Sequence, residues 1–456
     1  MNLRMFLGVL FLPLTAWSAA LTQAELARQV AAAAGGGRLQ AVSAGVVQAS
    51  GPVTAHAGTL APDRPTPPDD RTLYDIGSIT KVFTGLLLAE AVTRGELTLD
   101  TTLAALLPPD VELPERAGPR ITVRMLATHT SGLPRIPVEI PPDDYTNPYA
   151  AYGEADLWAT LRRVKLDFEP GTKASYSNLA VGLLGTLLAR RAGLTYPELL
   201  AARITGPLGM KDTVVEPDAG QRARRAPGFN AAGQAWPHWE FKALAGAGAI
   251  SSTLADLMRF AAAMLHPAES PLREAIELAW AKQELAASVG PGGSGLGWML
   301  AGDGRTRWHN GMTGGFHAAL FVSRELGVAT VVLTNRSDPS GSQLGEGLIR
   351  RAAGMPERPN PNRDRPEVAL SAAQLDRCTG TFRISPAFAL VFERRELTLL
   401  LTPTGQGTDR LAAASPDTFF SRRVAAEIVF DLPADGAPAT GLTLRQNGRE
   451  VKATRE

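Results

Sequence analysis

The sequence predicts an α/β (α+β) fold in which helices flank an antiparallel sheet. A helical lobe is inserted beside this sheet, and a small all-β domain follows at the C-terminus. Segments rich in β-formers occur at 42–56 and again at 316–334, whereas the chain between 97 and 237 is helical and loop-rich. Beyond residue 366 short alternating strands replace the mixed pattern. Strands from both ends of one domain fit a single sheet, whose faces helices must then cover.

Length and composition favour a two-domain globular protein. The chain has 456 residues, of which 45% are hydrophobic and 20% are charged, as in ordinary soluble proteins. Its formal net charge of +1 gives no attraction to nucleic acid or to an acidic membrane surface, so we expect neither as a partner. The single cysteine, Cys378, can form no internal disulfide, and we expect it to be buried as a small apolar residue.

Residues 1–20 have the layout of a secretory signal. Arg4 precedes an apolar stretch from Met5 to Trp17, and three small residues follow at 18–20. The apolar stretch is shorter than the about 20 residues that a membrane-spanning helix needs. We therefore predict a signal peptide over 1–20, a periplasmic or secreted protein, and no stable membrane span after processing. An uncleaved anchor is the alternative.

The main domain is predicted over 21–354. Apolar periodicity and turn residues predict, in chain order, a helix at 21–34, a hairpin of 42–47 and 53–56, a helix from Ser78 to about Gly95, and helices at 179–192 and 196–204. Another helix begins at Thr253, with Asp256 placed for a capping box. Strands follow at 297–300, 316–322 and 328–334, the last two joined near Gly327. A substrate is expected in the cleft between the sheet and the helical lobe.

The C-terminal part differs in pattern. Residues 355–369 are rich in proline, arginine and aspartate and are predicted to form a linker. Residues 370–456 are predicted to form a small β-barrel or sandwich. Alternating apolar positions occur around 390–392, 397–401, 428–430 and 442–444, and Asn447-Gly448 favours a hairpin turn. This domain contains no histidine and no cluster of polar residues, so we expect a supporting role.

Ser78 and Lys81 are the strongest candidates for catalysis. Residues three apart share one face of a helix, so Lys81 is expected one turn from the Ser78 hydroxyl. A serine needs a base within hydrogen-bond reach to act as a nucleophile. The unpaired N–H groups of the first helical turn favour a developing oxyanion. The alternative is a helix N-cap followed by a solvated lysine.

Two further segments are expected to reach the same cleft. Tyr176 and Asn178 precede the helix that starts near Leu179, and a neighbouring ammonium would draw Tyr176 toward the phenolate. A helix cap by Ser177 or Asn178 is the alternative. In the glycine-rich segment 308–316, an edge strand would offer the Met312 N–H to an oxyanion, and His309 would hold a carboxylate or assist proton movement. A structural histidine in a turn is the alternative there.

Together these segments resemble the serine β-lactamase and penicillin-binding protein superfamily, most closely its class C β-lactamase branch with D-alanyl-D-alanine peptidase and esterase relatives. The branch carries S-x-x-K, Y-x-N and K-T-G or H-x-G in this order, matched here by Ser78/Lys81, Tyr176/Asn178 and His309/Gly311. Further similar strings are GSITKVFTG (77–85), LATHTSGLP (126–134), PGTKASYSN (170–178), PLGMKDT (207–213) and TGGF (313–316).

The resemblance implies that Ser78 attacks a carbonyl and forms an acyl-enzyme, with Tyr176 and Lys81 sharing the general-base role. It also implies that Asn178 binds the substrate amide and that the N–H groups of Ser78 and Met312 form the oxyanion hole.

The sequence departs from the family at His309-Asn310-Gly311, where potent β-lactamases have Lys-Thr-Gly. Histidine is only partly charged at neutral pH, so a fixed cation for the lactam carboxylate is missing, although Asn310 still offers a donor. Efficient antibiotic hydrolysis is therefore not expected, whereas acylation of Ser78 is.

The predicted function is an exported serine hydrolase that acts on β-lactams or peptidoglycan D-amino-acid peptides. An esterase or D-amino-acid amidase with the same machinery, and a non-catalytic cell-wall binding protein, are the alternatives. No metal or cofactor is expected, because the six histidines show no H-x-x-x-H or H-x-H spacing. The absence of G-x-S-x-G argues against an α/β-hydrolase. The sequence does not predict an oligomeric state.

Overall fold

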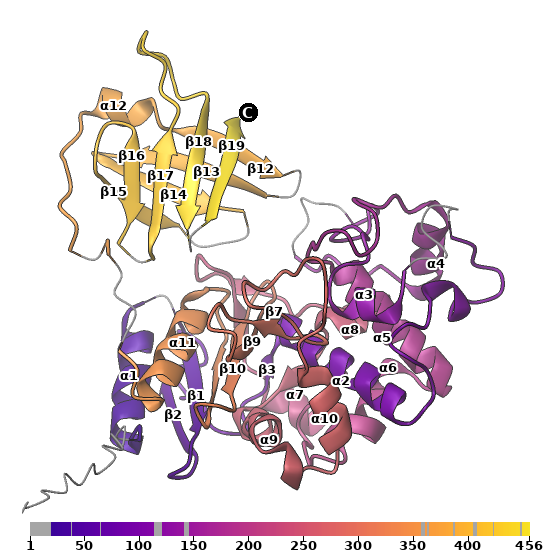
Figure 1. Cartoon of the computed structure of the whole chain (residues 1–456). Helices are drawn as coiled ribbons and strands as arrows, with labels where there is room; N and C mark the ends of the chain where they lie inside the picture. Colours follow the sequence, from indigo (N-terminus) through magenta and orange to yellow (C-terminus); the bar gives the residue numbers. More distant parts are fainter. Residues whose placement is uncertain are drawn as a thin grey trace, which may run out of the picture.

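The computed structural model describes residues 20–37, 39–63, 65–113, 121–140, 146–356, 361–362, 364–385, 388–404, 408–422, 424–446 and 449–456. Figure 1 shows a larger unit that mixes helices with a sheet and a smaller unit built mainly from strands. The predicted signal peptide, apart from Ala20, and the predicted turn at Asn447-Gly448 lie outside the described residues. Within the described part of the chain, no helix is both long and apolar enough to cross a membrane.

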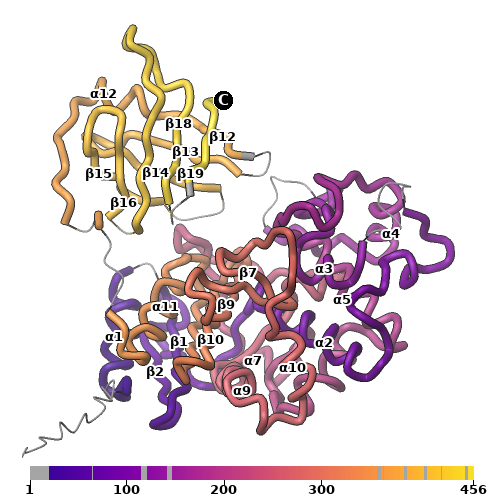
Figure 2. Tube along the Cα trace, in the orientation of Figure 1, coloured from indigo at the N-terminus to yellow at the C-terminus, as the bar shows by residue number. Residues whose placement is uncertain are grey.

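The larger unit is organised around one antiparallel sheet, with the strand order β2-β1-β11-β10-β9-β8-β7. Its strands are β1 (Ala41–Val47), β2 (Val53–Gly58), β7 (Gly293–Ser294), β8 (Met299–Leu300), β9 (Arg307–Met312), β10 (His317–Ser323) and β11 (Val328–Thr334). The early strand β1 pairs with the late strand β11, with Val42 opposite Thr334. In Figure 2 the indigo start of the chain accordingly lies beside the orange segment. The predicted sheet built from both ends of the domain is confirmed.

Helices cover both faces of this sheet. Alternate β1 residues point to opposite faces, because side chains alternate along a strand. Val42 packs in one cluster with Leu26 and Leu348, which belong to α1 (Gln23–Gly35) and α11 (Ser340–Ala352). Ala41 belongs to the larger core that also contains Leu257, which lies on α9 (Leu254–Leu265). The sheet is therefore a buried middle layer.

The helical lobe lies beside the sheet and surrounds α2 (Thr80–Thr93). Its other helices are α3 (Val123–Ala127), α4 (Glu154–Arg163), α5 (Asn178–Ala192), α6 (Tyr196–Leu200), α7 (Ala219–Ala223), α8 (Ala245–Gly248) and α10 (Arg273–Trp280). A π-helical turn, η3 (Ala201–Thr205), continues α6, so the predicted 196–204 helix is one continuous element. Short elements between these helices are η1 (Gly77–Ile79), η2 (Leu103–Ala105), η4 (Lys242–Leu244), η5 (Pro267–Glu269), β3 (Tyr74–Asp75), β4 (Gly228–Phe229), β5 (Ala235–Trp236) and β6 (Ser251–Ser252).

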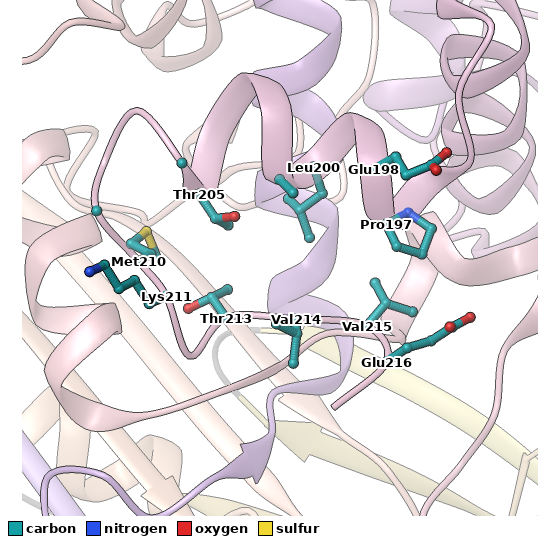
Figure 3. A pocket seen from close by; sticks show the side chains of 13 residues that line it. Pro197, Glu198, Leu200, Thr205, Met210, Lys211, Thr213, Val214, Val215 and Glu216 are labelled. Carbon is teal, nitrogen blue, oxygen red and sulfur yellow. The ribbon is translucent and has the colours of Figure 1, made fainter. Parts of the chain in front are cut away.

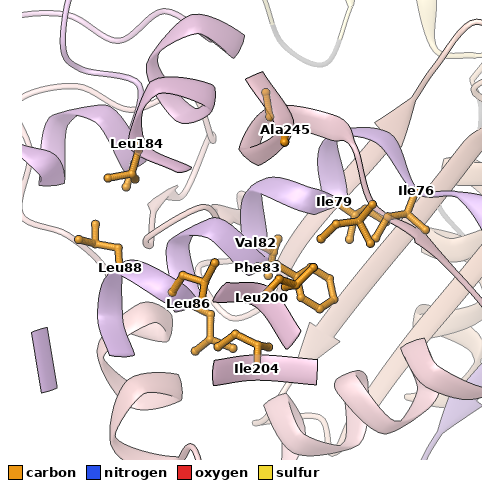
Figure 4. Close-up of a cluster of buried hydrophobic side chains, with 14 of the residues drawn as sticks. Ile76, Ile79, Val82, Phe83, Leu86, Leu88, Leu184, Leu200, Ile204 and Ala245 are labelled. Carbon is orange, nitrogen blue, oxygen red and sulfur yellow. The ribbon is translucent and has the colours of Figure 1, made fainter. Parts of the chain in front are cut away.

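Helix α2 is buried on all sides. Twelve of its fourteen residues are buried, and the rings of Phe83 and Phe260 stack with centroids 4.3 Å apart. Figure 4 shows side chains of α2 packed among those of neighbouring elements. At Gly85 a Cβ would lie 2.2 Å from the Leu296 carbonyl oxygen, so only glycine permits this approach of the chain. The helix is thereby fixed firmly within the core.

Two local predictions need correction. Strand β8 is shorter than the predicted 297–300, because Gly297 has φ +71° and turns the chain. At α9 the Thr253 hydroxyl accepts a bond from the Asp256 N–H, as a cap should. The Asp256 carboxylate does not complete a capping box; it accepts bonds from the Asp212 N–H at 2.7 Å and the Thr213 hydroxyl at 3.0 Å. A tertiary contact has replaced the local one.

The C-terminal unit is a closed barrel. Its elements are α12 (Ala372–Asp376), β12 (Gly380–Ser385), β13 (Phe388–Arg395), β14 (Thr398–Pro403), β15 (Asp409–Ala413), β16 (Thr418–Ser421), β17 (Ala426–Phe430), β18 (Gly441–Gln446) and β19 (Arg449–Arg455). Pairing of β12 with β19 closes it. The rings of Phe382, Phe392 and Phe430 meet inside with centroids 4.9–5.5 Å apart. Cys378 is buried here, as predicted. A small barrel filled by side chains in this way has a packed core.

Candidate active site

Ser78 lies in a tight turn that leads directly into α2. Strand β3 is held by β6, with Tyr74 opposite Ser252. Gly77 then adopts φ +48°, a conformation that favours glycine. Ser78 follows in the 3₁₀ turn η1, and α2 begins at Thr80. The hydroxyl therefore lies at the start of a buried helix, as the sequence predicts.

Lys81 is one turn further along α2 and is completely buried. Its Nζ lies 3.1 Å from the Ser78 Oγ and donates a hydrogen bond of 2.7 Å to the Ala247 carbonyl. Burial, with a smaller contribution from the charge of Arg135, lowers the pKa of Lys81 well below its usual value. A neutral amine carries a lone pair, so Lys81 can accept the proton of Ser78.

Tyr176 lies against the same pair of residues. Its ring centroid is 4.8 Å from the Lys81 Nζ, and its hydroxyl is hydrogen-bonded to Ser78. Burial raises the pKa of Tyr176 above its usual value, against smaller opposing effects of this hydrogen bond and of Arg135. The expectation that a Lys81 ammonium draws Tyr176 toward the phenolate is therefore wrong, because desolvation favours the uncharged form of both groups.

Strand β9 approaches the Ser78 turn at backbone distance. A Cβ on Gly311 would lie 1.8 Å from the Ile76 oxygen and 2.8 Å from the Ser78 nitrogen. A Cβ on Gly77 would lie 2.7 Å from the Met312 nitrogen. Two glycines thus bring the N–H groups of Ser78 and Met312 into one small space, where they are suited to bind an oxyanion.

The edge of β9 beside this turn is open. Strand β8 pairs with β9 only at Arg307 and Trp308, so 309–312 has a β-partner, β10, on one side alone. The sequence predicts an edge strand here. The structure has an inner strand whose second half behaves as an edge, because β8 is only two residues long. An extended substrate could pair with this free half.

His309 is buried, and its ring centroid is 6.2 Å from that of Tyr176. Its Nδ1 donates to the Asn310 carbonyl at 2.6 Å, and its buried Nε2 has no partner. Burial, and to a smaller extent the nearby Lys81, lowers the pKa of His309 to about 3. The expectation of a partly charged ring is wrong: His309 is neutral at pH 7 and offers a carboxylate no positive charge.

The Asn310 side chain is directed toward α11. Its Nδ2 donates to the Ser342 hydroxyl at 3.2 Å, and that hydroxyl lies 3.1 Å from the Nε2 of His317. Asn310 and His309 occupy successive positions of β9, so their side chains point to opposite faces of the sheet. The donor that the sequence analysis assigned to Asn310 is therefore engaged by a helix that covers the sheet.

Asn178 begins α5 and faces the site from the helical lobe. The preceding Ser177 caps the helix, accepting from the Ala180 N–H at 2.9 Å. This leaves the Asn178 side chain free of a capping role. Its Nδ2 donates to the Tyr149 hydroxyl at 2.9 Å, and its Oδ1 is buried without a partner. A buried acceptor without a donor is costly, so a substrate N–H would be well received there.

The structure adds two site residues, His129 and Arg135, that the sequence does not predict. The His129 ring lies 4.4 Å from that of Tyr176, and its Nδ1 accepts from the Ser177 N–H at 3.1 Å. His129 has φ +63°, so the loop that carries it is sharply turned. Arg135 lies with its Cζ 5.2 Å from the Tyr176 ring centroid. Their one signal in the sequence is the LATHTSGLP string, which contains His129 and ends just before Arg135.

A separate hollow lies on the lobe, shown in Figure 3. It is lined by parts of α6, η3 and the segment that follows them, including Leu200, Met210 and Val215. None of the predicted site residues lines it. The Ser78 arrangement is therefore distinct from this hollow, and its chemistry depends on the β9–α2 junction.

The chain is similar to several known proteins. A family model described as Beta-lactamase matches residues 26–354. The chain is 35% identical over 204 residues to the D-alanyl-D-alanine-carboxypeptidase/endopeptidase AmpH of Escherichia coli, covering 44% of this chain and 51% of that protein. It thus spans about half the length of that relative. The matched range 26–354 contains every residue of the site described above.

Two other similarities cover a larger share of the related protein. A β-lactamase of Escherichia coli is 26% identical over 321 residues, which cover 61% of this chain and 79% of that protein. The solved structure of a β-lactamase/D-alanine carboxypeptidase from Yersinia pestis complexed with citrate is 27% identical. It aligns with a TM-score of 0.63 over 73% of this chain and 97% of that one.

Proposed function

This chain belongs to the β-lactamase family, and from that premise we propose that it is an exported serine hydrolase that forms an acyl-enzyme at Ser78. Its proposed substrates are β-lactams or peptidoglycan peptides that contain D-amino acids. One observation carries the proposal: a buried amine, with a pKa lowered by burial, lies 3.1 Å from the Ser78 hydroxyl. A solvated lysine beside a helix cap would be protonated at neutral pH and could not take the proton.

Acylation follows from these positions. The Ser78 oxygen attacks the substrate carbonyl, and its proton passes to the neutral Lys81 amine. The carbonyl oxygen becomes negative and accepts hydrogen bonds from the N–H groups of Ser78 and Met312. The neutral Tyr176 phenol, hydrogen-bonded to Ser78, gives its proton to the leaving atom and regains one from Lys81. The bond to the leaving group breaks, and the acyl group remains on Ser78.

Deacylation uses the same groups in reverse. Water attacks the ester carbonyl and gives its proton to Tyr176, which passes its own phenol proton to Lys81. Lys81 then returns a proton to the Ser78 oxygen as the acid departs. The speed of this second half separates a β-lactamase from a penicillin-binding protein. The uncharged His309 supports slow processing of β-lactams, because the bicyclic carboxylate meets no cation at positions 309–312 of β9. Peptides and esters depend less on that contact.

Three assays on the mature protein test the proposal. A fluorescent penicillin reports a stable adduct, a chromogenic cephalosporin reports lactam turnover, and a short-chain ester reports esterase activity. Intact mass before and after incubation should show a covalent adduct in the wild type and none in Ser78→Ala. Cleavage of the ester alone would favour the esterase or D-amino-acid amidase. If the wild type and Ser78→Ala are equally inert, a non-catalytic cell-wall binding protein is the better description.

Export is part of the proposal and rests on the sequence of residues 1–20 alone. The expected result is that the protein recovered outside the bacterial cytoplasm begins near residues 19–21. N-terminal sequencing of the fractionated protein measures this directly. Recovery of the full-length chain from the cytoplasm would contradict it.

A further inference from the structure

Arg135 is an exposed cation at the active site that no described carboxylate neutralises. Other arginines of the same lobe are paired: Arg124 with Asp100 at 3.0 Å and Arg162 with Asp110 at 2.9 Å. The Arg135 Cζ is instead 5.2 Å from the Tyr176 ring centroid, and its charge reaches Lys81, whose pKa it helps to lower. This effect favours the neutral form of Lys81 and needs no carboxylate partner, so the guanidinium remains available to an acidic group of a substrate.

The backbone of Arg135 is fixed to the wall of the site that carries Asn178. Its carbonyl accepts hydrogen bonds from the Asn178 N–H at 2.8 Å and the Leu179 N–H at 3.3 Å. The same wall presents the Asn178 Oδ1, which is buried and unpartnered. Arg135 and Asn178 are therefore neighbours on the helical lobe, beside the site.

The opposite wall, formed by β9, has no matching charge at its active-site positions. His309 is neutral and buried, and Asn310 donates to Ser342 on α11. Strand β9 thus offers backbone groups for alignment, whereas the free positive charge lies on the lobe. The two walls differ in the substrate groups that they can recognise.

We propose that Arg135 binds a carboxylate on the acyl portion of the substrate, the portion that becomes attached to Ser78. This inference rests on the function proposed above and narrows its substrate class to acyl donors that carry an acidic group. Guanidinium and carboxylate form paired, charge-assisted hydrogen bonds of fixed geometry. An acid held there would also cover the Tyr176 ring, over which the guanidinium lies.

The test uses two acyl groups and two leaving groups. The acyl groups are N-succinyl-D-alanyl and N-succinamoyl-D-alanyl, which differ only in carboxylate against carboxamide. The leaving groups are 3-hydroxybenzoate and 3-hydroxybenzamide. They also differ as carboxylate against carboxamide, but on the other side of the scissile bond. We expect the wild type to favour the succinyl donors by about ten-fold in kcat/KM with either leaving group, as for one partly exposed charged hydrogen bond.

Three variants separate recognition from structure. Arg135→Gln should abolish the preference, because it lowers kcat/KM for the succinyl donors about ten-fold more than for the succinamoyl donors. Arg135→Lys should restore part of the preference, since it keeps the charge. Arg94→Gln, at the far end of α2 and more than half exposed, should behave as wild type.

Equal losses of Arg135→Gln toward both acyl groups would overturn the inference, because Arg135 would then act through Lys81 or Tyr176. A preference that follows the leaving group, or a wild type without any preference, would overturn it as well. If no donor gives an adduct at Ser78 by intact mass, the proposed function fails, and the inference fails with it. If an adduct forms but the succinyl and succinamoyl donors react equally well, the inference about Arg135 fails and the proposed function stands.

Discussion

Replacing Gly311 by alanine is expected to abolish acylation of Ser78 without unfolding the protein. The new Cβ would lie 1.8 Å from the Ile76 oxygen and 2.8 Å from the Ser78 nitrogen. Carbon–oxygen contacts are normally at least about 3.3 Å, so β9 and the η1 turn must separate by about 1.5 Å. The N–H groups of Ser78 and Met312 then cannot both reach one oxygen within about 3.1 Å, and losing one such donor costs about 10²–10³ in rate.

The assay is the rate at which Ser78 becomes labelled by a fluorescent penicillin or acylated by an ester, followed by intact mass. Thermal unfolding is measured on the same samples, and a strained contact in a packed region should lower stability by about 1–3 kcal/mol. Gly347→Ala is the matched control, since it lies on α11 with nothing within 4 Å of its Cβ position. Helix propensity predicts that this control gains up to about 1 kcal/mol.

A folded Gly311→Ala protein that acylates at the wild-type rate would refute the reasoning. It would mean that the close approach of β9 to Ser78 has no part in stabilising the oxyanion. If Gly311→Ala loses acylation because it is unfolded, Met312→Pro becomes the variant to measure. It removes the Met312 N–H without adding a side chain at Gly311.

Three further outcomes are expected. Lys81→Met should lose acylation yet melt at a higher temperature at pH 7. The pKa of Lys81 is lowered in the folded state, so folding opposes binding of a proton that the unfolded chain keeps below about pH 10. The gain in melting temperature should therefore shrink as the pH of the melt rises toward about 10. Asp75→Asn should lower the free energy of unfolding at pH 7 by about 2 kcal/mol, measured with denaturant, because partners including His238 and Arg225 lower the pKa of Asp75 to about 2. A carboxylate with a lowered pKa stabilises the folded state above about pH 4, so this loss should fade between about pH 4 and 2. Tyr149→Phe should reduce kcat/KM for amides about two- to ten-fold and lower stability by about 1–3 kcal/mol, since the Asn178 Nδ2 loses its acceptor. An unchanged kcat/KM would show that Asn178 needs no such support.

Much of the fold follows from local patterns in the sequence. The runs at 42–47 and 328–334 are apolar or β-branched apart from Ser43, and the structure buries both on two faces as β1 and β11. The Ser78–Lys81 spacing is also local, because two residues three apart on a helix must lie one turn apart. Such features need no knowledge of distant segments, and these predictions are confirmed.

The charge states of the site could not be predicted in this way. The pKa of Lys81 is lowered because α8 and other distant segments bury the amine. Its Nζ donates to the Ala247 carbonyl, which lies 166 positions away in sequence. The expected phenolate at Tyr176 is opposed by the burial of Tyr176 itself, which raises the pKa of the phenol. Asp256 shows the same limit at α9, since its carboxylate is taken by Asp212 and Thr213. Each error arises where a tertiary contact overrides a local rule.

The geometry of α2 explains why such a base can exist at all. Keeping an amine neutral in a core opposes folding, because the unfolded chain binds the proton more tightly. The free energy that offsets this comes from the apolar residues of the same helix, such as Phe83 and Leu86, which are fully buried. Gly85 adds a backbone contact with Leu296 that no other residue allows. A substitution such as Phe83→Ala should therefore change catalysis through Lys81. A loosened helix admits water, so the pKa of Lys81 rises toward its ordinary value. The acid limb of the acylation pH profile should then move to higher pH. If that variant were less stable but kept the wild-type pH profile, burial would not be what makes Lys81 a base.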